Sequence, residues 1–407
     1  MLKAIKIRIY PTKSQEKLLN ESFNACRYIY NLALEYKISY YKSTKKSLSY
    51  NQICQEFKDI RNSTEWLQNI PMQVYQQSFK GLEKAYSNFF KGSGFPKFKS
   101  KRGKQSIRFT NQTISKSLFY NNRIKINKDL NLLFSCSDRD YKYLLKYKES
   151  IKNITISKVP CGLYFASILV DGEISYKLKT DKIVGIDLGI KNLLTLSDGE
   201  VISNERFLDK SLNKLKKLQR RLSKKIKGSK NRNKARLLLA KQHYRIGNKR
   251  LNLLHNITSK LINENQVIIL EDLNIKGMVE NHKLAKSISD LGLGELYRQL
   301  EYKANWHNRE FIYVDRFFPS SKTCSCCGNV KQDLTLSDRV YNCASCGLEM
   351  DRDLNAARNI LDEGIKMKNR VAVTQIEACG LSSSGKSSFG LDFSYDRTKQ
   401  EYLEVES

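Results

Sequence analysis

A carboxylate at the end of an apolar strand constrains this chain more than any other feature. Residues 183–193, IVGIDLGIKNL, begin as an apolar run that carries Asp187 and is then broken by Gly189, which is typical of a buried strand followed by a turn. Burying an unpaired carboxylate costs several kcal/mol of folding free energy. Asp187 should therefore either cap a solvent-exposed turn or be neutralised by a cation.

Further carboxylates favour the second interpretation. Glu271 ends another apolar run, residues 266–270, and the segment DRDLNAA, which contains Asp351 and Asp353, opens a helix-like region. Three separated acids on rigid elements indicate one metal site, since oxygen ligands suit Mg²⁺ or Mn²⁺. A pair of such ions about 4 Å apart can bind the attacking and the leaving oxygen of a phosphodiester.

The charge of the chain points to a polyanionic partner. Its 407 residues include 72 Lys and Arg against 41 Asp and Glu, a formal net charge of +31, which is far more than solubility requires. Nucleic acid fits better than a membrane, because the chain has no run of about 18 apolar residues and no lipid-anchor motif. Residues 1–10 alternate unlike a signal peptide, so we expect a cytoplasmic protein.

The first half of the chain predicts a small antiparallel β-barrel that is interrupted by helices. Residues 1–10 have the alternation of a half-buried strand, and the capping-box pair Thr12 and Gln15 starts a helical region that extends to about residue 90. Short β-like runs follow at residues 106–110, 123–126, 154–156 and 164–170. We therefore assign residues 1–10 and 91–180 to the barrel and residues 11–90 to a helical insert.

Two segments have the composition of nucleic-acid contacts. The loop 91–104 alternates aromatic residues with cations, which suits stacking on bases and neutralising phosphates, although a solvated linker is the alternative. Residues 210–263 contain no acidic residue, and such a run would repel itself unless a phosphate backbone lay against it. The residues expected to contact nucleic acid are Phe95, Lys97, Phe98, Lys99, Lys101, Arg102, Arg220, Arg221, Lys224, Arg232 and Arg236.

The second half predicts an α/β sheet. From about residue 180 the expected order is strand, hairpin, long helices, strand, helix, strand. This order fits a ribonuclease H-like sheet whose first strand carries Asp187.

Two CxxC pairs predict a zinc site near the end of the second half. Cys324 and Cys327 are separated by fifteen residues from Cys343 and Cys346. Four thiolates satisfy tetrahedral Zn²⁺ and leave no open position, so the site should be structural. Cys326 could replace Cys327 as a ligand, but only Cys327 is followed by glycine in the way that Cys346 is.

Several spaced motifs together resemble the TnpB (OrfB) family. They are GIDLG at 185–189, LEDLNIKGM at 270–278, the cysteine pairs leading into DRDLNAARNI at 351–360, and, nearer the start, YPTK at 10–13 and FPKFK at 95–99. These motifs follow one another in the order seen in the family. The resemblance covers nearly all of residues 1–365.

The resemblance implies a transposon-encoded, RNA-guided DNA endonuclease, related to type V CRISPR effectors, that cuts target DNA beside a short adjacent motif. It implies a split RuvC-like nuclease domain at 181–320 and 349–370, a zinc ribbon at 321–348, and a wedge-like barrel with recognition helices. The partners would be a guide RNA from the transposon end and double-stranded target DNA, in a prokaryotic cytoplasm and associated with the nucleoid. Residues 371–407 fit no motif and are expected to form a disordered tail.

The resemblance also assigns the acids. Carried over by motif, Asp187, Glu271 and Asp353 would be the catalytic residues that bind Mg²⁺ or Mn²⁺. Asp353 is in register with the family's Asp-x-Asn-Ala helix start, whereas Asp351 would cap that helix or lie behind the metal ligands.

Two other functions stay open. A catalytically silent, RNA-guided DNA-binding repressor would lack the chemistry, yet all three acids are present. A transposition factor could use the same acids for strand transfer, which the zinc ribbon and the acid-free helices disfavour.

Overall fold

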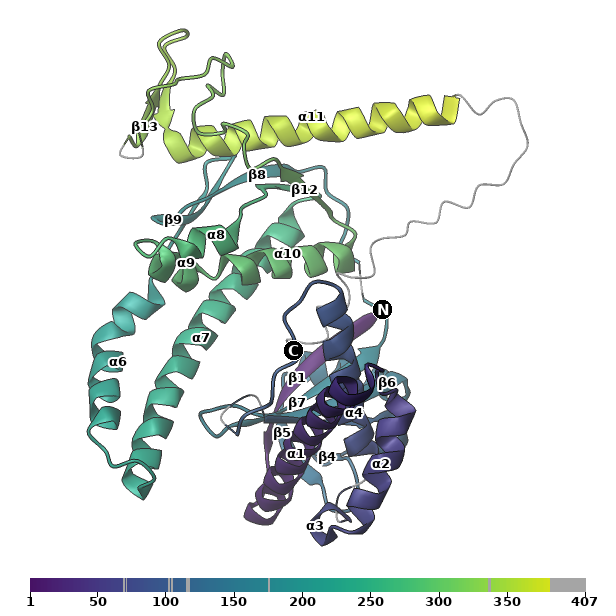
Figure 1. Ribbon diagram of the computed structural model, residues 1–407. Coiled ribbons are helices and arrows are strands. Elements are labelled where there is room, and N and C mark those ends of the chain that lie inside the picture. Colours follow the sequence, from purple (N-terminus) through teal and green to yellow (C-terminus); the bar gives the residue numbers. More distant parts are fainter. Residues whose placement is uncertain are drawn as a thin grey trace. The chain divides into compact units, whose positions relative to one another are not determined.

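The computed structural model describes residues 1–380 except positions 69, 71, 102, 104, 115–117, 175 and 336–337, and it gives only the backbone of residues 371–380. Two compact units make up this part of the chain (Figure 1). The first is Met1–Glu173 and the second begins at Ile174. No helix among the described residues is long and apolar enough to cross a bilayer.

A seven-stranded antiparallel sheet forms the centre of the first unit. Its strand order is β2-β6-β7-β1-β5-β4-β3. The strands are β1 (Leu2–Tyr10), β2 (Gln105–Thr110), β3 (Phe119–Tyr120), β4 (Arg123–Lys125), β5 (Asn131–Ser135), β6 (Ile151–Lys158) and β7 (Tyr164–Asp171).

The predicted closed barrel is an open half-barrel. Among the described residues no pairing joins the edge strands β2 and β3. The physical reason is the length of β3 and β4, which have 2 and 3 residues and so provide too few ladder hydrogen bonds to carry the sheet around to β2. Strand β5 and the short helices α5 (Asp138–Lys146), η1 (Asn111–Thr113) and η2 (Lys148–Ser150) were not predicted.

The helical insert packs on this sheet. It consists of α1 (Lys13–Thr44), α2 (Tyr50–Asn62), α3 (Glu65–Gln68) and α4 (Met72–Phe90). The Thr12 and Gln15 capping box is present at the start of α1, which is why the helix begins there. One continuous apolar core contains side chains from these helices and from the sheet, so the insert and the sheet fold as one body.

A five-stranded mixed sheet forms the centre of the second unit, which confirms the predicted α/β class. Its order is β10-β9-β8-β11-β12, in which β8, β9 and β10 are antiparallel and β8, β11 and β12 are parallel. The strands are β8 (Ile183–Leu188), β9 (Asn192–Leu196), β10 (Val201–Ser203), β11 (Val267–Glu271) and β12 (Glu310–Val314).

Helices cover both faces of this sheet. One face packs on α7 (Lys230–Glu264) and α10 (Leu293–His307), and the other on α11 (Arg352–Gly380). Figure 1 shows α6 (Phe207–Ser223) and α7 as an antiparallel pair of long helices. The short helices α8 (Ile275–Glu280) and α9 (Ala285–Leu291) precede α10, and the hairpin of β13 (Val340–Asn342) and β14 (Glu349–Asp351) precedes α11.

Two predicted boundaries are wrong. The second unit begins at Ile174, not after residue 180, because Arg309 donates to the carbonyl oxygen of Leu178 at 2.7 Å and ties that segment to it. Helix α11 runs to Gly380, so the first residues of the predicted tail are helical. They contain neither proline nor an internal glycine that would end the helix earlier. Residues 381–407 lie outside the described part.

Candidate functional site

Parallel pairing places two of the predicted acids side by side. Ile186 pairs with Leu270 across β8 and β11, so the next residues of these strands, Asp187 and Glu271, are neighbours. Ile186 and Leu270 belong to the core under α7 and α10. Because side chains alternate along a strand, both acids face the opposite side of the sheet, where α11 lies.

Helix α11 lies close against β8 at Gly185. A Cβ atom on Gly185 would lie 2.6 Å from the backbone nitrogen of Leu361 and would overlap the carbonyl oxygen of Ala357. Only glycine therefore permits this approach. The helix carries Asp353 in its first turn, and so delivers the third acid to the same end of the sheet.

Asp351 and Asp353 have different roles in the structure. Oδ1 of Asp351 accepts hydrogen bonds from the backbone nitrogens of Asp353 and Leu354 at 2.9 and 3.1 Å, which is helix capping. It is the charge of Asp353 that contributes to the raised pKa of Asp187. Asp272, which follows Glu271 at the end of β11, is paired with Arg316.

The three acids share an electrostatic environment that lacks a full counter-charge. Burial, followed by the charges of Glu271 and Asp353, raises the pKa of Asp187 to about 7. Burial also raises the pKa of Glu271, against the opposing effect of a hydrogen bond from Ser320. Arg352 lies 3.7 Å from Asp353 and compensates only in part. Carboxylates that repel one another in this way are the donor set that a hard divalent cation stabilises.

The oxygen atoms of the three acids suit Mg²⁺ or Mn²⁺ as ligands. The four cysteines differ from the acids in that their ligand atoms are already close together. Among the described residues the sulfurs of Cys324, Cys327, Cys343 and Cys346 alone form a set close enough to hold an ion as it stands, and all of them lie within 4.8 Å of one another. The acids would draw closer together on binding an ion.

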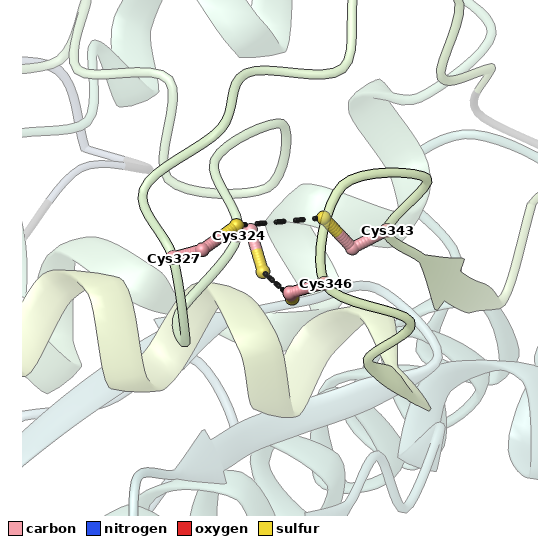
Figure 2. Close-up of side chains that lie close together, drawn as sticks. All are labelled: Cys324, Cys327, Cys343 and Cys346. Carbon is pink, nitrogen blue, oxygen red and sulfur yellow. Dashed lines mark hydrogen bonds between the residues drawn. The ribbon is translucent and has the colours of Figure 1, made fainter.

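The cysteine sulfurs have the spacing of a tetrahedral zinc site (Figure 2). The Sγ atoms of Cys324 and Cys346, and those of Cys327 and Cys343, are 3.6 Å apart. Four sulfurs at about 2.3 Å from one zinc ion would lie about 3.8 Å apart. Cys326 is exposed and lies outside this group, so it is Cys327 that joins the other three.

The two loops that carry the cysteines turn back sharply, and their environment lowers the pKa of the Cys343 thiol while neighbouring thiols raise the pKa values of Cys327 and Cys346. Gly328 and Gly347 have φ of 76° and 72°, which turns each loop back after its second cysteine. Hydrogen bonds from the backbone nitrogens of Cys346 and Ser345 lower the pKa of the Cys343 thiol to about 6. A deprotonated sulfur is the form that binds metal.

The acid-free helices present most of their predicted contact residues to solvent. Arg220, Arg221, Lys224 and Arg236 are exposed, and within the described part of the chain no carboxylate pairs with them. Arg232 differs, because it donates to the carbonyl oxygens of Leu222 and Lys225 at 3.0 and 2.7 Å and so closes the turn between α6 and α7.

The aromatic and basic loop of the first unit is partly used in packing. Phe95 makes edge-to-face contacts with Tyr86 and Phe89 of α4, whereas Phe98 is 56% exposed. Asn31 holds the backbone of Lys99 through two hydrogen bonds of 2.9 and 2.7 Å. Lys97 and Lys101 are exposed, and Arg102 lies outside the described residues.

Lys99 also lines a cavity of about 540 Å³ between α1, α4 and the sheet of the first unit. Its Nζ lies 3.9 Å from the centre of the Tyr30 ring, and burial lowers its pKa. Among the described residues, the lining includes Lys80, Lys84 and Arg108 and no carboxylate. An acid-free cavity with several cations suits a phosphate group.

The sequence did not reveal the residues that support the acids. Ser320 donates to Glu271, and Asn355 and Asn359 of α11 donate to the backbone of the segment that contains Ser320. The sequence did contain one signal for a shared role of the asparagines: they are four residues apart, which places both on one face of a helix.

Comparisons with known proteins agree with the motifs. Three family models match: "Probable transposase" of the OrfB type at residues 167–282, the "Cas12f1-like, TNB domain" at 294–360, and a "Helix-turn-helix domain" at 1–46. A Streptomyces pristinaespiralis protein named "Putative RNA-guided DNA endonuclease" is 36% identical over 89% of both chains. The chain belongs to the TnpB (OrfB) family.

Other members of the TnpB family and more distant structures also match. The Escherichia coli K12 protein named "Putative RNA-guided DNA endonuclease InsQ" is 31% identical over 89% of this chain and 92% of its own. A cryo-EM structure of a Cas12f1–sgRNA–target DNA complex covers 88% of this chain and 98% of its own at 16% identity, with a TM-score of 0.48. The residues matched by the helix-turn-helix model of the TnpB family form strand β1 and the single helix α1 here.

Proposed function

We propose that this TnpB-family protein is an RNA-guided DNA endonuclease encoded by a transposon. The observation that carries the proposal is the convergence of Asp187, Glu271 and Asp353 at one end of the sheet, in a chain whose relatives are named as such endonucleases. The order of the five-stranded sheet supports assigning this unit as RuvC-like, that is, ribonuclease H-like.

Asp187, Glu271 and Asp353 would hold Mg²⁺ or Mn²⁺, and the four cysteines would hold Zn²⁺. A divalent ion bound at the acids supplies charge that stabilises the phosphodiester transition state and makes a water molecule more acidic. The zinc ion would take no part in the chemical step, since its four ligands fill the coordination sphere.

Elements and residues around the three acids hold them in place and set their electrostatic environment. Strands β8 and β11 fix the backbone of the first two acids on one rigid sheet, and α11 fixes the backbone of the third, so that only their side chains would move toward a bound ion. The backbone N–H of Leu188 lowers the pKa of Asp187 and so opposes the effect of burial. Arg352 stays beside Asp353 at 3.7 Å, where its charge limits repulsion among the acids.

Two basic surfaces would hold the nucleic acid. The exposed arginines and lysine of α6 and α7 (Arg220, Arg221, Lys224 and Arg236) would lie along a phosphate backbone. Since no carboxylate of the described residues pairs with them, their charge is left for that contact. In the first unit, the cavity lined by Lys99 and Arg108 would take phosphate groups beside the motif that the protein reads in DNA, while base pairing to the guide reads the rest.

The test is to express the chain with its native flanking DNA, purify it in high salt and sequence the retained RNA. High salt removes loose electrostatic binding. One discrete RNA from the transposon end, together with cleavage of matching DNA by the parent and not by Asp187→Ala, supports the proposal. Asp187→Ala should retain the RNA, because the substituted side chain lies at the acids and not on the basic surfaces.

Other results would indicate another function. Cleavage retained in Asp187→Ala would contradict the assignment of the acids. Retained RNA with guide-directed DNA binding but no cleavage by the parent would indicate a silent repressor. Heterogeneous RNA, together with guide-independent joining of transposon ends, would indicate a transposition factor.

A further inference from the structure

One hydroxyl group fixes the carboxylate of Glu271. The Oγ of Ser320 donates a hydrogen bond to Oε1 of Glu271, although the two residues are 49 positions apart. Ser320 is only 7% exposed, so water does not readily replace it as the donor. The bond occupies part of one carboxylate oxygen and leaves the other oxygen for a ligand.

Two asparagines of α11 hold the backbone around Ser320. Nδ2 of Asn359 donates to the carbonyl oxygens of Ser320 and Thr323 at 2.7 and 2.6 Å. Nδ2 of Asn355 donates to the same Thr323 oxygen at 2.6 Å. Both asparagines are buried, and both lie on the helix that carries Asp353.

The segment held by these asparagines is the one that enters the cysteine group. Thr323 and Ser325 flank Cys324, and the backbone nitrogen of Ser325 donates to Oδ1 of Asn355 at 2.9 Å. Cys324 itself is 2% exposed. The backbone on either side of this metal-binding cysteine is therefore bound to α11, and the same stretch of chain contains the donor to Glu271.

We propose that Ser320 is a positioning residue for Glu271, and that the cysteine group, through Asn355 and Asn359, sets the separation of Glu271 from Asp353. Glu271 lies on β11 and Asp353 on α11, so this hydrogen-bonded chain is a direct link between them. Zinc at the cysteines would then strengthen binding of a divalent ion at the acids. This role rests on the proposed function, because it assumes that the acids bind such an ion.

The test measures Mn²⁺ affinity by calorimetry or electron paramagnetic resonance on the full, zinc-loaded chain, and needs no cleavage. Ser320→Ala should weaken Mn²⁺ binding by about 10–100-fold, as loss of a partner behind a metal ligand typically does. Ser320→Thr retains the hydroxyl and should recover most of the affinity. Ser321→Ala is the matched control, since the adjacent Ser321 is partly buried and its hydroxyl makes no hydrogen bond within the described part of the chain.

A double-mutant cycle tests the link between α11 and Ser320, on which the role of the cysteine group depends. If Asn359 acts through Ser320, Asn359→Ala should weaken Mn²⁺ binding on its own but add little in the Ser320→Ala background. Additive losses would overturn the link. Zinc content and thermal unfolding of each variant identify any that does not fold, and the Ser320 series stands without Asn359→Ala.

The outcomes separate the two proposals. Wild-type affinity in a folded Ser320→Ala variant would overturn the positioning role and leave the endonuclease proposal intact. Equal losses in Ser320→Ala and Ser320→Thr would also overturn it, because the hydroxyl would then not be the cause. Absence of Mn²⁺ binding by the parent would instead contradict the acid site itself.

Discussion

At the scale of single residues, Asp187, one of the proposed catalytic acids, is buried at an energetic cost. Its pKa is raised to about 7 by burial and by two neighbouring carboxylates, against an ordinary value of about 3.9. The folded state therefore prefers the protonated form. Stability from this preference is complete below the ordinary pKa and is lost as pH rises through about 7.

Asp187→Asn should remove this pH dependence. In Mg²⁺-free buffer with zinc retained, the variant should gain about 1–3 kcal/mol in free energy of unfolding relative to the parent as pH rises from about 5 to about 8. Urea unfolding at several pH values measures the gain. Added Mg²⁺ should stabilise the parent and not the variant, and a difference that stays constant with pH would refute the account of Asp187.

The adjacent cysteines, Cys326 and Cys327, offer a matched pair. Cys327→Ser should lower the zinc content from about one ion per chain towards zero and unfold the loops between β12 and α11, because metal binding and folding are coupled. Cys326→Ser should retain the zinc, since Cys326 is exposed and lies outside the group. Elemental analysis and limited proteolysis check both outcomes, and equal zinc loss in the two variants would contradict the ligand assignment.

At the scale of elements, the packing of α11 on β8 holds the acids together. Gly185→Ala should cost about 1–3 kcal/mol of stability, because the added methyl group meets the backbone of α11. Displacement of α11 should also weaken Mn²⁺ binding. Gly294→Ala in α10 is the control, since nothing lies within 4 Å of a Cβ there, and it should change stability by less than about 1 kcal/mol. An unchanged free energy of unfolding in Gly185→Ala would refute the close contact between β8 and α11.

The elements that the sequence predicted correctly are those whose apolar residues form a recognisable pattern within the element itself. The apolar strands β8 and β11 and the long helices follow from local pattern. Strand β3 has only 2 residues, and β5 has three consecutive apolar residues in place of the alternation of a half-buried strand. Both depend on pairing with the rest of the sheet, which local pattern does not contain. Local pattern also could not reveal the role of Ser320, because its partner Glu271 is 49 residues away. The cysteine pairs could be predicted, because their spacing along the chain is itself the signal of a zinc site.

At the scale of the whole molecule, the net charge of +31 should appear as steep salt dependence. Replacing Arg220, Arg221 and Lys224 together with alanine should reduce the slope of log affinity for guide RNA or target DNA against log salt by about 0.7–0.9 for each lost phosphate contact. Lys210→Ala is the control, because Lys210 is paired with Glu205 at 2.7 Å. Equal slopes in the triple variant and the parent would exclude these residues from the nucleic-acid surface.

Reprogramming of the guide tests the central claim most directly. The complex purified with its RNA is compared with complexes whose guide segment has been replaced by two unrelated sequences, each on DNA carrying one matching target. We predict that the cut moves to the target that matches the guide, requires Mg²⁺ or Mn²⁺, and is absent in Asp187→Ala. A cut at the same place with every guide, or cutting that persists without RNA, would contradict the account.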